Sequence, residues 1–271
     1  MPELPEVETT RLGLAPHLVG RRINTAIVRN RNLRWPVPRK LAELVAGRRI
    51  EKLERRSKYL LVDCGGAWLI FHLGMSGSLR VVPADLPPRT HDHVDLVLDS
   101  GQALRLHDPR RFGAVLWEAG EPRQHKLLQG LAPEPLSEDF NADWLFERTR
   151  KRATAIKNLL MDNHHVCGVG NIYANESLFR AGIHQARAAG RISHPRYVKL
   201  VEEIRETLRA AIEAGGSTLR DFVHADGSSG WAQQSYFVYG RAGEPCLKCG
   251  ATIKTARIGQ RSAFYCPVCQ R

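Results

Sequence analysis

The sequence predicts an α+β protein with several domains, and three observations lead to this prediction. Short β-type runs fill the first half of the chain, helical periodicity follows, and two cysteine pairs lie near the end. A chain of 271 residues with 43% hydrophobic residues is long enough for more than one core. We therefore expect an N-terminal helix with an antiparallel β-sandwich over residues 1–130, a helical domain over 131–236 and a zinc-binding β-hairpin over 237–271.

The chain begins with the residues MPELPEVE, a composition typical of a first helical turn. Proline suits the first helical position and acids suit the positive end of a helix, so we expect a helix from Pro2 to about Gly13. Loss of Met1 would leave Pro2 as a secondary amine. Because an α-amino group has a pKa near ~8, against ~10.4 for lysine, Pro2 is a candidate nucleophile. Glu3 and Glu6 are then candidates for a proton donor and a positioning group, although the stretch could also serve only to start a helix.

Seven β-type runs, separated by turn residues, follow this helix. Strands at such spacing without amphipathic helices between them indicate an antiparallel sandwich or barrel. The runs are Ile23–Val28, Arg49–Leu53, Tyr59–Val62, Ala67–His72, Val94–Leu98, Ala103–Leu106 and Ala114–Trp117.

Glycines and prolines between residues 120 and 135 indicate a connector, after which the apolar residues recur at helical spacing. The clearest repeat begins at Val198 and stops at Gly215-Gly216, which predicts a core helix with a C-cap. Shorter helices are expected over about Asp143–Lys151, Ala153–Leu160 and Asn171–Arg180.

Two C-x-x-C pairs near the end, Cys246/Cys249 and Cys266/Cys269, are separated by sixteen residues. This spacing predicts one zinc ion held by four thiolates, which leaves no coordination position open for catalysis. The residues between the pairs predict a β-hairpin over 251–265 that projects Lys254, Arg257 and Arg261. Such a hairpin suits DNA contact, and a purely structural or protein-binding ribbon is the alternative.

Glycines and basic residues in the helical region suggest phosphate binding. Gly168-Val-Gly-Asn171 stands before a helix, where backbone amides and an amide side chain can hold a phosphate, although helix connections also use glycine and asparagine. A basic run precedes this motif, and its alternative interpretation is a solvated helix face. It comprises Arg148, Arg150, Lys151, Arg152 and Lys157.

Two apolar residues in loops of the first domain are candidates for wedges between DNA base steps. Met75 lies between Gly74 and Gly77, and Phe112 follows a pair of arginines. Buried loop plugs are the alternative for both. His91 and His93 lack a clear third ligand, so we expect them to form hydrogen bonds and not to bind a metal.

The charge balance favours a polyanionic partner. Forty Lys and Arg residues against 28 Asp and Glu residues give a formal charge of +12. No apolar run approaches the ~18 residues of a membrane span, and no secretory signal is visible, so an intracellular protein is expected. In such a compartment the paired cysteines suit metal, and Cys64 and Cys167 are expected to be inert core thiols.

Taken together, these motifs resemble those of the bacterial formamidopyrimidine-DNA glycosylase family along the whole chain. They are PELPEVET, RSKYL, HLGMSG, HDHVD, DPRRFG, GVGNIY and the four-cysteine finger. The resemblance implies a β-sandwich, a helix-two-turn-helix module and a zinc finger that together hold damaged duplex DNA. It also implies a bacterial cytoplasmic protein, monomeric and associated with the nucleoid when bound to DNA.

The resemblance further implies roles for individual residues. Pro2 would attack C1′ of the damaged nucleotide and Glu3 would donate a proton, while Lys58 would assist β-elimination and Arg261 δ-elimination. The other matched positions would contact DNA, and many relatives carry lysine at the position of Arg152. These positions are His91, Arg110, Arg152, Lys157 and Asn171, with Met75 and Phe112 filling the gap left by the flipped nucleotide.

Two other functions fit part of the sequence. An endonuclease VIII-like glycosylase shares the nucleophile but prefers oxidised pyrimidines and usually carries glycine where this chain has Leu4. A non-catalytic zinc-ribbon DNA-binding protein explains the charge and the cysteines, but not Pro2, Glu3 and Lys58 together. Lesion preference is expected to depend on the loop around Gly216–Ala225.

Overall fold

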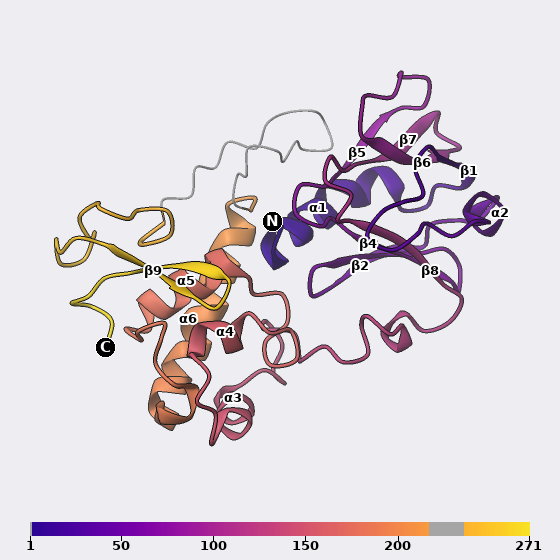
Figure 1. Ribbon diagram of the computed structural model, residues 1–271. Coiled ribbons are helices and arrows are strands. Elements are labelled where there is room, and N and C mark those ends of the chain that lie inside the picture. The colour runs from indigo at the N-terminus through magenta and orange to yellow at the C-terminus, as the bar shows by residue number, and fades with distance from the viewer. Residues whose placement is uncertain (1, 217–235) are drawn as a thin grey trace. The chain divides into compact units, whose positions relative to one another are not determined.

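The computed structural model of the protein describes residues 2–216 and 236–271, and the chain forms two compact units. Unit 1 contains residues 2–129 and 214–216, and unit 2 contains residues 130–213 and 236–271. Figure 1 shows the strands of the sandwich in unit 1 and most of the helices in unit 2. None of the helices in the described ranges has the length and apolar character needed to span a membrane. The division into three domains stays a prediction.

Unit 1 consists of two four-stranded antiparallel sheets and the long helix α1, as predicted. One sheet has the order β1-β6-β7-β5 and the other β2-β3-β4-β8, and α1 packs on strands of both. Apolar residues from α1 and from the two sheets form one continuous core. The elements are α1 (Leu4–Leu18), β1 (Ile23–Val28), α2 (Leu41–Val45), β2 (Lys52–Arg56), β3 (Tyr59–Asp63), β4 (Trp68–His72), β5 (Ser78–Pro83), β6 (Asp92–Leu98), β7 (Gln102–His107) and β8 (Ala114–Glu118).

Helix α1 differs from the prediction at both ends. It begins at Leu4 and not at Pro2, because Glu3 has an extended backbone and occupies the N-cap position. It also continues beyond Gly13 to Leu18, since Leu14 and Leu18 are buried in the core. A glycine inside a helix costs only about 1 kcal/mol, which this burial offsets.

One other predicted strand of unit 1 is corrected by the structure, and two further elements were missed. The second strand covers Lys52–Arg56, whereas Arg49 forms only an isolated bridge with Arg22. Strand β5 and the short helix α2 were not predicted at all. In β5 the central Arg80 interrupts the apolar run, and its partner Asp92 is distant in the sequence.

Unit 2 contains four α-helices and the C-terminal hairpin. Helix α5 has the predicted bounds, and α6 ends just before the predicted Gly215-Gly216 cap, where both glycines have positive φ angles. The expected helix over Ala153–Leu160 is shorter, because Ala155 has an extended backbone and serves as the N-cap. The elements are η1 (Pro122–Gln124) at the end of unit 1, followed by α3 (Ala142–Thr149), α4 (Ile156–Leu160), α5 (Asn171–Arg180), η2 (Ala189–Arg191), α6 (His194–Glu213), β9 (Lys254–Ile258) and β10 (Arg261–Tyr265).

Candidate functional site

The first turn of α1 fixes the residues that surround Pro2. The backbone N–H of Glu3 donates to Glu6 Oε2 at 2.8 Å, within a capping box formed by the two glutamates. Pro2, Glu3 and Glu6 are all buried. A reciprocal cap of this kind satisfies helix donors and fixes the direction in which the chain enters the helix. The nitrogen of Pro2 therefore lies beside a carboxylate-rich, rigid turn.

A glycine lies against this turn. A Cβ atom at Gly216 would come within 3.4 Å of Glu6 Cα, and the φ angle of +82° at Gly216 favours glycine. The remainder of the predicted lesion loop, up to Ala225, lies outside the described residues.

Lys58 lies in the turn between β2 and β3, where the structure brings it near a histidine that the sequence did not single out. Burial, followed by the positive charges of Lys58 and Arg34, lowers the pKa of His72 to about 4. The ring is therefore neutral at pH 7. The N–H of Gly74 donates to His72 Nδ1 at 3.0 Å, so Nε2 carries the proton and can donate a hydrogen bond. Its position in HLGMSG, at the end of an apolar strand and before a glycine, was the available clue.

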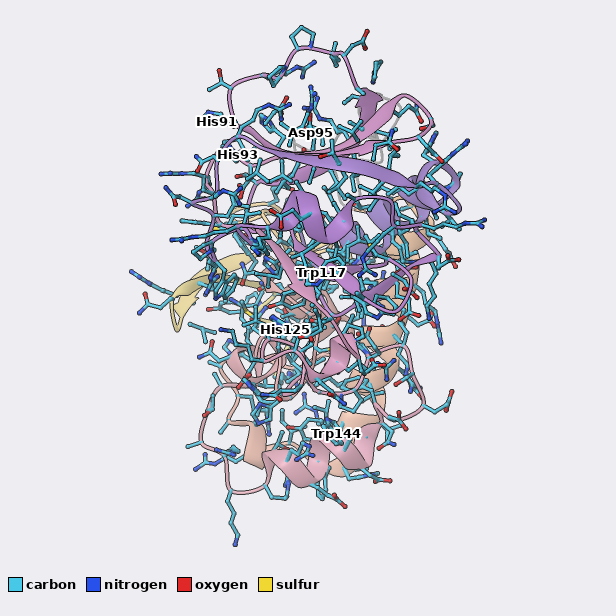
Figure 2. All side chains as sticks on the ribbon, turned by 90° about the vertical axis from the view of Figure 1, so that its right-hand side faces the viewer. His91, His93, Asp95, Trp117, His125 and Trp144 are labelled. Carbon is cyan, nitrogen blue, oxygen red and sulfur yellow. The ribbon has the colours of Figure 1, made fainter. Side chains whose placement is uncertain are left out.

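His91, Arg110 and Phe112 are exposed at loops of unit 1, while Met75 is half-buried. The rings of His91 and His93 lie 6.2 Å apart, and Figure 2 shows them beside each other at one edge of the sandwich. The guanidinium group of Arg110 lies 4.9 Å from the ring centre of Phe112. As predicted, His93 forms a hydrogen bond, with its Nε2 2.9 Å from the carbonyl oxygen of Asp108.

The four cysteines of unit 2 come together as predicted. Their sulfur atoms all lie within 4.8 Å of one another, close to the spacing of about 3.8 Å that Zn–S bonds of ~2.3 Å give in a tetrahedron. The N–H groups of Lys248 and Cys269 each point at a cysteine sulfur at 3.4 Å, and hydrogen bonds of this kind orient metal ligands. These residues form the site of one structural zinc ion. Among the described residues, no other group of histidines, cysteines and acids can hold a metal.

The other two cysteines are buried, one in each unit. Burial raises the pKa of Cys64 to about 12, so this thiol stays protonated, as expected for an inert core residue.

The zinc hairpin is seated on α4. Lys157 is fully buried, and its ammonium group donates to the carbonyl oxygen of Ser262 at 2.7 Å. Gly259, in the turn of the hairpin, lies so close to Asn158 that a Cβ atom would come within 3.0 Å of the amide oxygen. Arg261 is exposed on the same turn, as predicted.

Two adjacent residues of α5 anchor the hairpin and the segment before it. Asn175 Oδ1 accepts from the N–H of Phe264 at 2.8 Å. Glu176 accepts from the N–H groups of Phe237, Val238 and Tyr239 at 2.8–3.0 Å. These roles could not be predicted from the sequence, because a buried polar residue inside a helix has no local pattern.

The proposed phosphate-binding residues of unit 2 lie at helix ends. Asn171 is the first residue of α5, with Gly170 as the N-cap, and its Oδ1 is buried without a hydrogen-bond partner among the described residues. Lys151 and Arg152 are exposed beside an open hollow of about 650 Å³, which Arg148, His164 and His165 also line. Arg150 also lines this hollow, but it donates to the carbonyl oxygens of Gly190 and Ile192 and so has a structural role.

Three family models match successive parts of the chain. The formamidopyrimidine-DNA glycosylase N-terminal domain matches residues 1–115, the H2TH domain of the same proteins matches 131–223, and a zinc finger found in FPG and IleRS matches 243–271. The chain belongs to the formamidopyrimidine-DNA glycosylase family.

Members of this family from several bacteria align with the whole chain. The formamidopyrimidine-DNA glycosylases of Stutzerimonas stutzeri and Marinobacter nauticus are each 58% identical, with full coverage of both chains. Among solved structures, the MutM (FPG) protein of Thermus thermophilus is 39% identical with a TM-score of 0.89, and covers 99% of this chain and 98% of its own. An FPG mutant of Lactococcus lactis in complex with Fapy-dG-containing DNA is 33% identical with a TM-score of 0.92 and full coverage of both chains.

Proposed function

We propose that this protein is a bifunctional DNA glycosylase and abasic-site lyase, which removes oxidised purines such as 8-oxoguanine and formamidopyrimidines from duplex DNA. Its relatives support the glycosylase activity by name. The Lactococcus lactis Fpg was solved as a mutant with Fapy-dG-containing DNA and, in another structure, non-covalently bound to DNA containing an abasic site. The observation that carries the proposal is the buried turn at Pro2, where Glu3 and Glu6 cap the helix beside the nitrogen of Pro2.

In the first step, the secondary amine of Pro2 attacks C1′ of the damaged nucleotide. The N–C1′ bond forms, the glycosidic bond breaks, and Glu3 supplies a proton as the base leaves and the sugar ring opens. A secondary amine joined to such a carbon gives a cationic iminium, which accepts electrons when the C2′ proton is removed. One nucleophile therefore serves base removal and strand cleavage, in which Lys58 assists β-elimination and Arg261 δ-elimination.

The target nucleotide must leave the duplex before this attack, at a cost of a few kcal/mol. Met75, Arg110 and Phe112 fill the gap in the base stack. Phe112 is suited to this role because it is 41% exposed on a loop, and an exposed apolar side chain can be inserted between base steps. His91, Arg152 and Asn171 hold the DNA backbone around the lesion, and the fully buried Lys157 supports the zinc hairpin that carries Arg261.

Borohydride trapping tests the nucleophile. Protein that begins at Pro2 should be trapped covalently on a duplex containing 8-oxoguanine, because borohydride reduces the iminium to a stable amine. Protein that retains a residue before Pro2 carries an amide nitrogen whose lone pair is delocalised, so it should give no crosslink. Equal trapping of the two forms would exclude Pro2 and make Lys58 the next residue to test.

Two controls complete this experiment. The blocked protein should bind the same duplex with an unchanged salt dependence, whose slope is about −0.9 per phosphate contact, because its basic residues are intact. A second duplex that carries an oxidised pyrimidine separates the proposed activity from that of an endonuclease VIII-like enzyme. Faster excision of the pyrimidine than of 8-oxoguanine would support that alternative.

A further inference from the structure

Three loops of unit 1 carry the residues that we propose to contact DNA at the flipped nucleotide. Each loop contains a residue with a left-handed backbone, and two of these three residues are not glycine: Gly74 has a φ angle of +66°, His91 of +76° and Arg111 of +56°. A non-glycine residue with this backbone costs about 1–2 kcal/mol and persists only where the surroundings hold it. The loops around Met75, His91 and Arg110 are therefore held in place by other residues.

Asp108 connects two of these loops directly. Its N–H donates to the carbonyl oxygen of His91 at 3.0 Å, and its own carbonyl oxygen lies 2.9 Å from His93 Nε2. Its side-chain Oδ2 accepts from the N–H of Gly113 at 2.7 Å, and its carbonyl oxygen also accepts from Arg111. Asp108 is fully buried, so water does not compete for these bonds.

The third loop packs on the residues that Asp108 holds. A Cβ atom at Gly74 would lie 2.4 Å from the carbonyl carbon of Phe112, so the two backbones are in direct contact. A Cβ atom at Gly113 would lie 2.7 Å from the carbonyl oxygen of His72 and 2.9 Å from Asp108 Oδ2. The loop that carries Met75 is therefore fitted against the backbone of Phe112 and Gly113.

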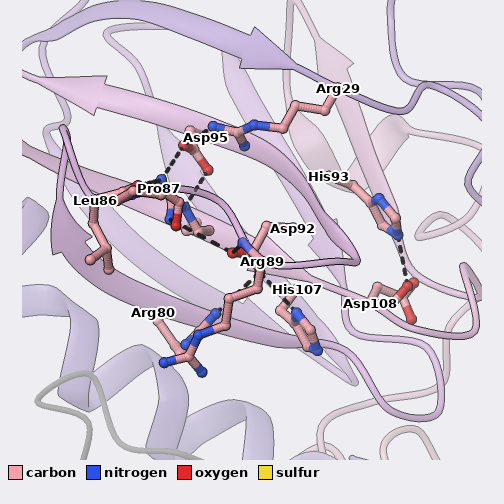
Figure 3. A network of polar contacts seen from close by, with 11 residues as sticks. Arg29, Arg80, Leu86, Pro87, Arg89, Asp92, His93, Asp95, His107 and Asp108 are labelled. Atoms are coloured by element: carbon pink, nitrogen blue, oxygen red, sulfur yellow. Dashed lines mark hydrogen bonds and ion pairs between the residues drawn. The ribbon is translucent and has the colours of Figure 1, made fainter.

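A buried ion network fixes the segment that leads into His91 (Figure 3). Arg105 is 1% exposed, forms two bonds of 2.8 and 2.9 Å with Asp95, and donates to the carbonyl oxygens of Leu86 and Pro87. The neighbouring Asp92 accepts from the N–H of Arg89 at 2.8 Å. The chain just before His91 is thus tied to β6 and β7.

Asp92 is itself bound on two further sides. Its Oδ1 accepts from Arg80 at 3.1 Å and lies 2.8 Å from His107 Nδ1. The network therefore extends across β5, β6 and β7, and the side chains of these strands hold the backbone of the loop that precedes His91.

We infer that Asp108 is a positioning residue that holds the loops of Met75, His91, Arg110 and Phe112 as one rigid unit. This inference rests on the proposed function, because the loops that Asp108 holds carry the residues that we propose to contact DNA. Asp108 does not touch DNA itself. It acts through the backbone bonds that set the directions of Arg110 and Phe112.

Two substitutions of Asp108 separate its hydrogen bond from its charge. Asp108→Ala removes the acceptor of Gly113. Asp108→Asn can keep an oxygen at that position, because the other oxygen of Asp108 is buried without a hydrogen-bond partner among the described residues. Asp108→Ala should slow excision from a lesion duplex on the order of 10–100-fold, the loss typical of slightly misplaced groups, and Asp108→Asn should retain most of the activity.

Double-mutant cycles show whether Asp108 acts through Arg110. If it does, Asp108→Ala combined with Arg110→Ala should be scarcely slower than either single variant, whereas Asp108→Ala combined with Lys254→Ala, on the zinc hairpin, should be multiplicative. A general loss of stability would give multiplicative effects with both partners and would overturn the inference. His93→Phe keeps a ring but loses the bond to the Asp108 carbonyl, and should show the same coupling with Arg110 more weakly. It carries the test if Asp108→Ala does not fold.

Amide hydrogen exchange supplies a measurement that needs no enzymatic activity. In Asp108→Ala, exchange should accelerate at Gly74 and Gly113 and stay unchanged at strands β2 and β3. Unchanged exchange at both glycines would refute the positioning role even if excision were slow. Conversely, a wild-type protein without excision activity would refute the proposed function and leave this exchange result to decide the role of Asp108.

Discussion

Lys157 donates a hydrogen bond of 2.7 Å from its ammonium group to the carbonyl oxygen of Ser262, and this bond seats the zinc hairpin on α4. Ser262 directly follows Arg261, so the buried lysine fixes the strand that presents this exposed arginine. Burial, and then the charge of Arg261, lowers the pKa of Lys157 to about 8. Lys157, which the sequence predicted to contact DNA, is thus part of the protein interior and supports the hairpin that carries Arg261.

The depressed pKa of Lys157 gives a prediction with a defined sign. Between pH 8 and the ordinary lysine pKa of 10.5, the unfolded chain binds more protons at this residue than the folded chain does. Its contribution to stability should therefore rise with pH across this window. In protein with ¹³C-labelled lysine, one ε-carbon signal should titrate near pH 8 and disappear in Lys157→Met. A Lys157 signal that titrates with the surface lysines would contradict this prediction.

Zinc should be required for DNA binding but not for the folding of unit 1. We expect Cys249→Ser to release the metal and to lose lesion-duplex binding, because zinc supplies about 10–16 kcal/mol of folding free energy in small fingers. The circular dichroism signal of the sandwich should remain. The matched control is Cys64→Ser, which makes the same change in unit 1 and should retain one zinc per chain. Normal DNA binding by metal-free Cys249→Ser would exclude the finger as a DNA contact.

Glu176→Gln should loosen the segment that leads into the finger. A glutamine offers one acceptor oxygen and turns an NH₂ group toward backbone N–H donors, so we expect a loss of about 1–3 kcal/mol in the stability of unit 2. Amide exchange at Phe237, Val238 and Tyr239 should accelerate. Glu206→Gln, on the exposed face of α6, is the control and should leave these amides protected.

Phe112→Ala should slow base excision from an intact duplex far more than strand cleavage at a preformed abasic site, where less unstacking is needed. Met75→Ala should behave in the same way. Ile27→Ala is a matched control, since Ile27 is also 41% exposed in unit 1 but lies on β1. Equal losses on the two substrates would reject the wedge role.

Gly74→Ala should lower the stability of the protein much more than Gly101→Ala, although both glycines have positive φ angles. Around Gly101 a Cβ atom would meet nothing within 4 Å, so only the backbone cost of about 1–2 kcal/mol applies. At Gly74 the added atom would overlap the backbone of Phe112. The melting temperatures of the two variants should therefore differ by several degrees. Equal melting temperatures would show that the loop around Gly74 can shift to accommodate the added Cβ atom.

The parts of the structure that depend on local patterns were predictable from the sequence. The cysteine spacing defined the metal site, and the glycine-asparagine boundary and apolar spacing defined α5 to the residue. Parts that depend on distant partners were not predictable. Strand β5 was missed because Arg80 looks unsuited to a core strand until Asp92, on another strand, is seen beside it. The role of Asp108 likewise exists only through His93 and Gly113.

The residues of the candidate site show the same difference between local sequence patterns and contacts with distant residues. Motif matching selected Pro2, Glu3 and Lys58, and the structure adds the burial of all three residues and the cap formed by Glu6. It adds His72, whose neutral ring depends on burial and on a lysine and an arginine supplied by other loops. The lowered pKa of His72 therefore could not be predicted from its residue type alone.

The adjacent anchors Asn175 and Glu176 impose an order on how the C-terminal module is made. Both residues leave the ribosome some sixty residues or more before the backbone groups that they bind, at Phe237–Tyr239 and Phe264. Helix α5 can therefore form and present its acceptors before the four zinc-binding cysteines are synthesised. Zinc is then bound last during biosynthesis, after helix α5 has formed. Metal binding therefore stabilises the packing of the hairpin on a helix that is already in place.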